Sequence, residues 1–170
     1  MENSALCYPG RAAQPGGRQF CRRLPSGKLS QAGFRFSQKQ SARIHQCFQR
    51  LAPLLDAVKQ PRFIHGDLWR GNILVSKTGE LMAIIDCDRA LFGDPAFELA
   101  TGWMIDADIL GGYGRQPGAS PEAVLRRRLY KLLLDLEDCY FLRHEYDNPT
   151  ASEELAPKIL SAVAELEAAF

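Results

Sequence analysis

The pattern of apolar and polar residues divides the chain into an aperiodic first part and a second part with clear helical and strand-like segments. In residues 1–40, apolar residues occur singly, and turn-forming glycines and prolines interrupt them at 9–10, 15–17 and 25–27. Beyond residue 40, apolar positions recur at helical spacing or form short runs. The pattern predicts an irregular arm over 1–40 and a folded unit over 41–170.

Several stretches of the second part have the spacing of amphipathic helices. The first runs from an N-cap at Ser41 to Val58, and Pro53 is expected to kink or split it near 49–50. Further helices are predicted over 95–105, 120–146 and 152–169, with a glycine-rich loop over 109–120. The apolar stripe of the longest helix consists of Leu125, Leu129, Leu132, Leu133, Leu136 and either Cys139 or Tyr140.

Three short apolar runs lie between the first two helices. Phe63-Ile64 and residues 73–75 flank a polar turn, and a third run, 81–85, ends at Asp86. The residues 89–92 that follow are expected to be a connecting loop. We predict a small β-ribbon that places Asp67 and Asn72 on one loop and Asp86 at the end of a neighbouring strand.

Charge is unevenly distributed along the chain, whose formal net charge is +1. Residues 1–40 carry seven Lys/Arg and one acid, a balance of +6, whereas residues 41–170 carry fourteen and nineteen, a balance of −5. An acidic body favours a small cationic or amine-bearing partner over a nucleic acid. The five cysteines have no CxxC spacing, and the sequence has no signal peptide or long apolar span. These features predict a cytoplasmic protein with reduced thiols and no membrane segment, and they leave its oligomeric state open.

The polar loop carries chemistry-bearing side chains at a distinctive spacing. His65-Gly66-Asp67 is followed after four residues by Asn72, and Ile85-Asp86 closes the third apolar run. Phosphoryl transfer needs a carboxylate that orients and deprotonates the acceptor hydroxyl, and an amide and a second carboxylate that hold Mg²⁺. With the later Phe-Gly-Asp-Pro-Ala-Phe-Glu-Leu-Ala at 92–100, these motifs resemble the aminoglycoside phosphotransferase family. Within it, the His-Gly-Asp-Leu-Trp of 65–69 resembles the sequence of fructosamine kinases at this point.

This resemblance implies a mainly helical α+β fold, the C-terminal lobe of a protein-kinase-like fold, in which a small β-ribbon carries the catalytic loop. It implies that Asp67 is the catalytic base and that Asn72 and Asp86 bind Mg²⁺. The phosphoryl donor would be ATP or another nucleoside triphosphate. The acceptor would be a hydroxyl of a small molecule such as an aminoglycoside, aminosugar or fructosamine. The alternative is structural: Asp67 caps a turn, and the other two residues close a hairpin.

Four further polar residues have expected supporting roles. His65 would hydrogen-bond the loop backbone and so position the catalytic carboxylate. Asp88 would either assist at the metal or remain a solvated loop acid. Asp94 is expected to be the N-cap of the helix that begins with the next residue, and Glu98 to help orient the catalytic loop.

Residues 1–40 lack the features of a nucleotide-covering lobe. Such a lobe carries a loop over the phosphates and a strand lysine that contacts them. Here the glycines do not follow apolar strand runs, and Lys28 has no Val-Ala-Ile-Lys context, so no nucleotide lysine is found. We expect this lobe to be missing and the chain to be a truncated phosphotransferase with little activity alone. The alternatives are a non-catalytic remnant or binding module, or a Mg²⁺-dependent hydrolase that uses Asp67 and Asp86.

Overall fold

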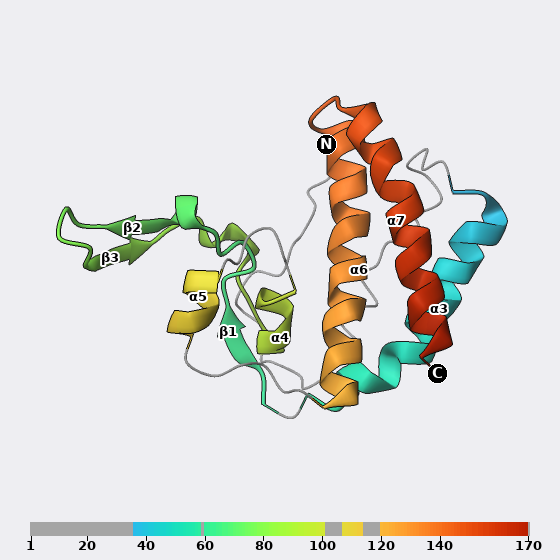
Figure 1. Ribbon diagram of the computed structural model, residues 1–170, viewed down its shortest axis with the longest axis horizontal. Coiled ribbons are helices and arrows are strands. Elements are labelled where there is room, and N and C mark those ends of the chain that lie inside the picture. The colour runs from blue at the N-terminus through green and yellow to red at the C-terminus, as the bar shows by residue number, and fades with distance from the viewer. Residues whose placement is uncertain (1–35, 59, 101–106, 114–119, 170) are drawn as a thin grey trace.

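Helices predominate in the computed structural model, which describes residues 36–58, 60–100, 107–113 and 120–169 (Figure 1). The helices are α3 (Gln38–Asp56), α4 (Pro95–Glu98), α5 (Ala107–Gly112), α6 (Pro121–His144) and α7 (Pro149–Ala168). The strands are β1 (Arg62–Ile64), β2 (Ile73–Val75), β3 (Leu81–Ile84) and β4 (Leu91–Gly93), and short 3-10 turns η1 (Arg70–Asn72) and η2 (Cys87–Arg89) follow two loops. The predicted class, mainly helical α+β, is therefore confirmed.

Helix α3 begins earlier than predicted and continues past its proline. Ser37, not Ser41, is the N-cap: its hydroxyl accepts from the Gln40 backbone N–H, and the Gln40 side chain accepts from the Ser37 N–H. Pro53 does not split the helix, although the ribbon changes direction toward its C-terminal end (Figure 1). Leu51 and Leu55 are buried on either side of this proline, so their packing holds the helical path across the lost hydrogen bond.

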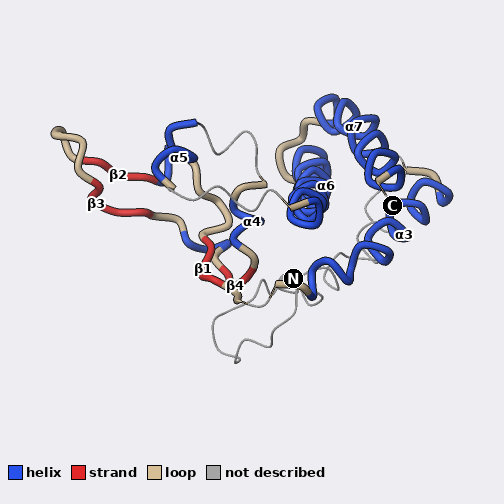
Figure 2. The backbone as a smooth tube through the Cα atoms, turned by 60° about the horizontal axis from the view of Figure 1, so that its bottom comes forward, coloured by secondary structure: helices blue, strands red, loops and turns tan. Residues whose placement is uncertain are grey.

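The core lies where α6 packs against α7, α3 and α4. Figure 2 shows α6 between the strands and α4 on one side and α7 and α3 on the other. The predicted stripe of α6 is buried at Leu129, Leu132, Leu133 and Leu136, and Leu125 is partly buried. The largest fully buried side chains of the core are Ile44, Leu51, Leu55, Leu129, Leu132, Ile159, Val163 and Leu166. No helix in the described ranges is long and apolar enough to cross a membrane.

The ends of the other helices differ from the prediction. The helix expected over 95–105 ends at Glu98 with Leu99 as C-cap, and residues 101–106 lie outside the described part. The loop expected over 109–120 includes the end of α5, whose last two residues are glycines; residues 114–119 are not described. Helix α7 starts three residues early because Asn148 accepts from the Ala151 N–H and acts as its N-cap.

Two separate antiparallel strand pairs flank the loop of residues 65–72. Strand β1 pairs with β4, with Ile64 opposite Leu91. The prediction of a connecting loop over 89–92 is therefore wrong for residues 91 and 92, which belong to β4. Strands β2 and β3 form a hairpin that projects from the body (Figure 1). Most of the hairpin's apolar side chains are exposed, namely Leu74, Val75, Leu81, Met82 and Ile84.

Candidate functional site

The loop between β1 and β2 brings Asp67 and Asn72 into direct contact. The Asn72 Nδ2 donates to the Asp67 backbone carbonyl at 2.9 Å and to Asp67 Oδ2 at 3.1 Å. Both partners are acceptors, so they fix the amide orientation and leave Asn72 Oδ1 available as an oxygen ligand. Asn72 is buried and Asp67 is half-buried. One loop thus presents a carboxylate and an amide oxygen side by side.

Asp86 is joined to this loop through the backbone of Ile85. The Ile85 N–H donates to the Asn72 carbonyl at 2.9 Å, which extends the β2–β3 ladder by one residue pair. Asp86 itself has φ 65° and ψ 58°, a left-handed conformation that costs a non-glycine residue roughly 1–2 kcal/mol. Its side chain is exposed and has no hydrogen-bond or ion-pair partner among the described residues. The turn therefore ends β3 with an exposed carboxylate, one residue after the backbone bond from Ile85 to Asn72.

The His65 side chain also connects the loop that carries Asp67 to the segment that carries Asp86. Its Nε2 donates to the Ile85 carbonyl at 2.8 Å, so the ring bonds the segment that leads to Asp86. The imidazole is buried, and its Nδ1 has no partner within the described part of the chain. The ring thus bonds the segment after β3 and not, as the sequence predicts, the backbone of its own loop.

The carboxylate of Glu98 holds the start of the loop. It accepts from the His65 N–H at 2.5 Å and from the Gly66 N–H at 3.0 Å, and Glu98 is only 6% exposed. Backbone donors that bond a carboxylate make strong, charge-assisted hydrogen bonds. Helix α4 thereby positions the two residues that precede Asp67.

Glycine is required at position 66 for two independent reasons. Gly66 has φ 79°, and a Cβ there would lie 2.6 Å from the backbone oxygen of Arg89. The η2 turn after Asp86 therefore packs directly on the loop that carries Asp67. This contact explains the Gly in the His-Gly-Asp sequence.

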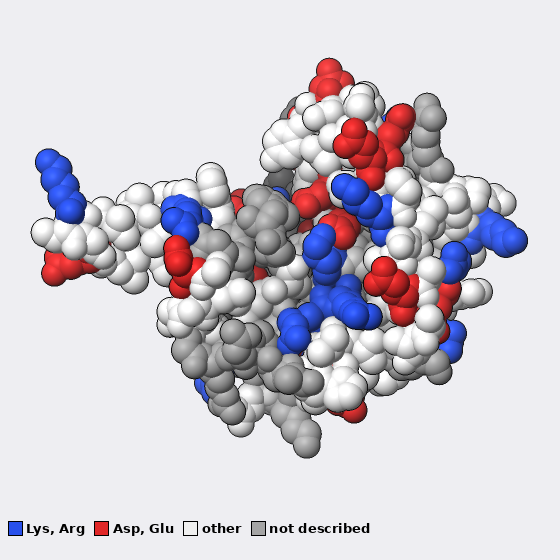
Figure 3. All heavy atoms as spheres, viewed as in Figure 1, with Lys and Arg blue, Asp and Glu red and all other residues white. Residues whose placement is uncertain are grey.

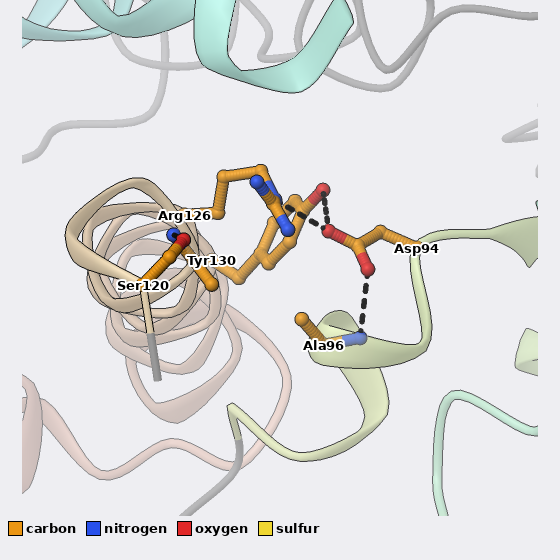
Figure 4. Close-up of polar contacts among 6 residues, drawn as sticks. Asp94, Ala96, Ser120, Arg126 and Tyr130 are labelled. Atoms are coloured by element: carbon orange, nitrogen blue, oxygen red, sulfur yellow. Dashed lines mark hydrogen bonds and ion pairs between the residues drawn. The ribbon is translucent and has the colours of Figure 1, made fainter. Parts of the chain in front are cut away.

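Asp94 attaches α4 to α6 in addition to capping α4 (Figure 4). Its Oδ1 accepts from the Ala96 N–H at 3.0 Å, while its Oδ2 accepts from Arg126 Nε at 2.9 Å and Tyr130 Oη at 3.2 Å. The ion pair is largely buried, with side-chain exposures of 18% for Arg126 and 9% for Asp94. The sequence indicated the cap; Arg126 and Tyr130 were missed because they lie more than thirty residues away.

The remaining predicted residue, Asp88, lies exposed in η2 with no partner among the described residues. A further ion pair that the sequence did not indicate joins Arg70 Nη2 of η1 to Asp108 Oδ2 of α5 at 2.7 Å, and both side chains are exposed.

The predicted site residues around the loop separate into two groups. Asp67, Asn72, His65 and Glu98 share one hydrogen-bonded network that also holds the backbone leading to Asp86, whereas Asp88 stands apart.

The donor set suits a magnesium ion that arrives with a nucleotide. No group of three or more His, Cys, Asp or Glu in the described ranges could hold a metal ion by itself. Mg²⁺ in phosphoryl-transfer sites is bound by one or two carboxylates, water and the substrate phosphates. The amide oxygen of Asn72 and the carboxylate of Asp86, which have no partner among the described residues, are oxygen donors of the kind that such an ion binds.

Comparison with solved structures shows a shared fold over three quarters of this chain. A thermostable mutant of aminoglycoside phosphotransferase APH(4)-Ia in its apo form superposes with a TM-score of 0.52 at 21% identity, covering 75% of this chain and 46% of that chain. Another mutant, in ternary complex with AMP-PNP and hygromycin B, gives 0.50 at 23% identity, with 75% and 45% covered. APH(4)-Ia itself gives the same four values. This chain spans less than half the length of these structures.

Family comparison gives the assignment. A search of curated proteins finds no significant match. The model of a family described as the phosphotransferase enzyme family, APH, matches residues 5–131. That match covers 127 of the 170 residues (131 − 5 + 1), and it includes the whole of the loop and both strand pairs. The chain therefore belongs to the phosphotransferase enzyme family.

Proposed function

We propose that the described residues form the catalytic-loop lobe of a protein-kinase-like phosphotransferase. In this proposal, residues 41–170 are the C-terminal lobe, and the phosphoryl group of ATP or another nucleoside triphosphate is transferred to a hydroxyl of a small molecule. The observation that carries the proposal is the pair of hydrogen bonds from Asn72 Nδ2 to Asp67. They place a candidate base and a candidate metal ligand in contact.

Asp67 is the proposed general base. Its Oδ2 accepts from Asn72, which leaves Oδ1 to orient the acceptor hydroxyl and to take its proton as the new O–P bond forms. The Glu98 carboxylate and the Gly66 turn hold the backbone on which Asp67 is carried, so the base is positioned by α4 and η2.

Asn72 and Asp86 are the proposed ligands of Mg²⁺. A bound Mg²⁺ would neutralise charge on the nucleotide phosphates. The Ile85–Asn72 backbone bond and the His65–Ile85 bond fix the spacing between the two ligand-bearing segments. His65 is therefore a positioning residue in this proposal.

The acceptor is proposed to be amine-bearing, such as an aminoglycoside or aminosugar. One solved relative was crystallised with hygromycin B and AMP-PNP. The −5 balance of residues 41–170 favours a cationic acceptor independently of that relative.

Activity of the chain alone is expected to be weak. The described lysines lie on α3, at the hairpin tip, on α6 and on α7, and none lies on the loop that carries Asp67. A lysine above the phosphates would have to come from elsewhere. The competing proposal is a binding module without transfer activity.

Transfer from γ-labelled ATP to a panel of aminoglycosides and aminosugars tests the proposal. Asp67→Asn should lower turnover by a factor on the order of 10² to 10⁴ with little change in nucleotide affinity. Asp88→Asn, an exposed carboxylate in the same region, is the matched control and should leave turnover unchanged. A turnover for Asp67→Asn within about twofold of the parent would contradict the base assignment. Nucleotide binding without any transfer, in all variants, would favour the binding module.

A further inference from the structure

A hollow between α6 and α7 contains none of the residues of the loop that carries Asp67. Its volume is about 320 Å³, which is at the lower end of the range of small-molecule pockets, roughly 300–1,000 Å³. The two residues that follow α4 contribute one wall, and one face of α6 and one face of α7 contribute the others. The lining residues are Leu99, Ala100, Val124, Arg127, Arg128, Lys131, Ala162, Glu165 and Leu166.

Three cations of α6 lie along one face of the helix at this hollow. Val124, Arg127, Arg128 and Lys131 are spaced i, i+3, i+4 and i+7, which places them in one stripe. Figure 3 shows Lys and Arg side chains gathered over the middle of the molecule on the face that α6 occupies in Figure 1. This gathering contrasts with the negative balance of residues 41–170 as a whole.

The charge of this stripe is only partly neutralised by the protein. Like charges three and four residues apart on a helix destabilise it. Lys131 forms an ion pair with Asp135, and Arg127 also has an interaction partner, but Arg128 has no hydrogen-bond or ion-pair partner within the described ranges. Glu165, across the hollow, likewise has none there. The neighbouring Arg126, by contrast, forms an ion pair with Asp94.

The floor of the hollow is apolar. Leu166 is 1% exposed and Ala100 is 7% exposed, so both belong to the hydrophobic core and present carbon to the hollow. Val124 and Ala162 add further apolar surface from the two helices. An apolar floor under a cationic wall suits a ligand that has both a hydrocarbon part and an anionic group.

We propose that this hollow binds a small organic anion with an apolar body, such as an aliphatic or aromatic carboxylate or sulfonate. The anionic group contacts Arg127, Arg128 and Lys131, and the apolar body covers Ala100 and Leu166. The negative charge of Glu165 repels such a ligand and lowers its affinity. Removal of this charge should therefore strengthen binding, whereas removal of the arginine charges should weaken it. The site is distinct in residues and chemistry from the Asp67 loop, whose proposed ligands are a cationic acceptor and a nucleotide.

Fluorescence titration of the full chain with 1-anilinonaphthalene-8-sulfonate, an anionic aromatic dye, tests this site. The dye should bind saturably to one site, and octanoate should displace it. The double variant Arg127→Gln/Arg128→Gln should weaken binding by about tenfold, and Glu165→Gln should strengthen it by about threefold. The neutral dye N-phenyl-1-naphthylamine should show neither change.

Met82→Gln is the control, because Met82 is the most exposed large apolar side chain of the projecting hairpin, at 68%. This variant should leave anionic-dye affinity unchanged. Equal dye affinity in the double Arg variant and the parent, or loss of binding in Met82→Gln, would overturn the proposal. Amide chemical-shift changes on octanoate addition should map to Ala100, Val124 and Ala162; changes confined to the hairpin would overturn it as well. Far-UV circular dichroism verifies that each variant is folded.

Discussion

Asn72 donates its side-chain amide to Asp67 twice, to the backbone carbonyl at 2.9 Å and to the carboxylate at 3.1 Å. The same Asn72 accepts a backbone bond from Ile85, the residue before Asp86. One side chain and one peptide group therefore connect the proposed base to the segment of the second metal ligand. The proposed chemistry depends on this short network, and the rest of the lobe holds it in place.

Glu98 is expected to stabilise the loop through its charge. Glu98→Gln keeps one oxygen acceptor but loses the charge on the bonds to His65 and Gly66. The free energy of unfolding should fall by about 1.5–3 kcal/mol, the usual value of hydrogen bonds to a charged group. Urea denaturation measures this change. Glu154→Gln, an exposed residue of α7, serves as the control and should lie within about 0.5 kcal/mol of the parent. Equal stability of Glu98→Gln and this control would show that the loop does not need the carboxylate.

Asp94 combines a helix cap and an ion pair, and two variants separate them. Asp94→Asn retains an N-cap acceptor for Ala96 but removes the charge that pairs with Arg126. Asp94→Ala removes both. The alanine variant should be less stable than the asparagine variant by about 1 kcal/mol, the usual value of an N-cap. Thermal and urea unfolding of the two proteins check this difference. A zero difference would mean that the cap contributes nothing to the stability of α4.

Alanine substitutions at Gly66 and Gly79, which both have positive φ, distinguish the cost of backbone strain from the cost of steric overlap. Gly79→Ala should cost about 1 kcal/mol, because φ is 86° but nothing lies within 4 Å of the new Cβ. Gly66→Ala should cost clearly more, because its Cβ would overlap the Arg89 oxygen at 2.6 Å. Stability measured by urea denaturation compares the two. Equal losses would indicate that η2 can move away from the loop without cost.

The ion pair between α3 and α7 predicts a pH dependence of stability. The hydrogen bond from Arg43 lowers the pKa of Glu167 below its ordinary value of 4.5. A carboxylate whose pKa is lower in the folded state contributes stability above its unfolded pKa, and this contribution is lost as the pH falls through the folded pKa. The stability difference between the parent and Glu167→Gln should therefore shrink between about pH 6 and about pH 3. A difference independent of pH over that range would exclude the pair as its source.

Local patterns predicted the helical part of the fold because the signals lie within a few residues of one another. The stripe of α6 repeats over many turns, and its burial at Leu129 and Leu132 follows from that repetition. Helix ends were less accurate, since a cap depends on which of several candidates is used. Ser37 and Gln40 form a complete capping box, whereas the predicted Ser41 lies inside the helix.

The candidate site residues and the support from Glu98 could be predicted from the sequence, but the long-range contacts around them could not. The spacing of Asp67, Asn72 and Asp86 is visible in the sequence, and the loop network joins their segments as that spacing suggests. The β1–β4 pair was not predictable, because three-residue strands show too little alternation and pair across a long separation. The same holds for the Asp94–Arg126 ion pair, which depends on the packing of α4 against α6.

Paramagnetic relaxation by Mn²⁺ tests the central claim, that Asn72 and Asp86 form one metal site next to Asp67. In amide NMR spectra of the full chain with a non-hydrolysable ATP analogue, small additions of Mn²⁺ should broaden the signals of Asn72 and Asp86 first. Asp86→Asn should greatly reduce this broadening, and Asp88→Asn should leave it unchanged. Broadening centred on the polar end of α6 near His144 and Asp147, or broadening that persists unchanged in Asp86→Asn, would contradict the account.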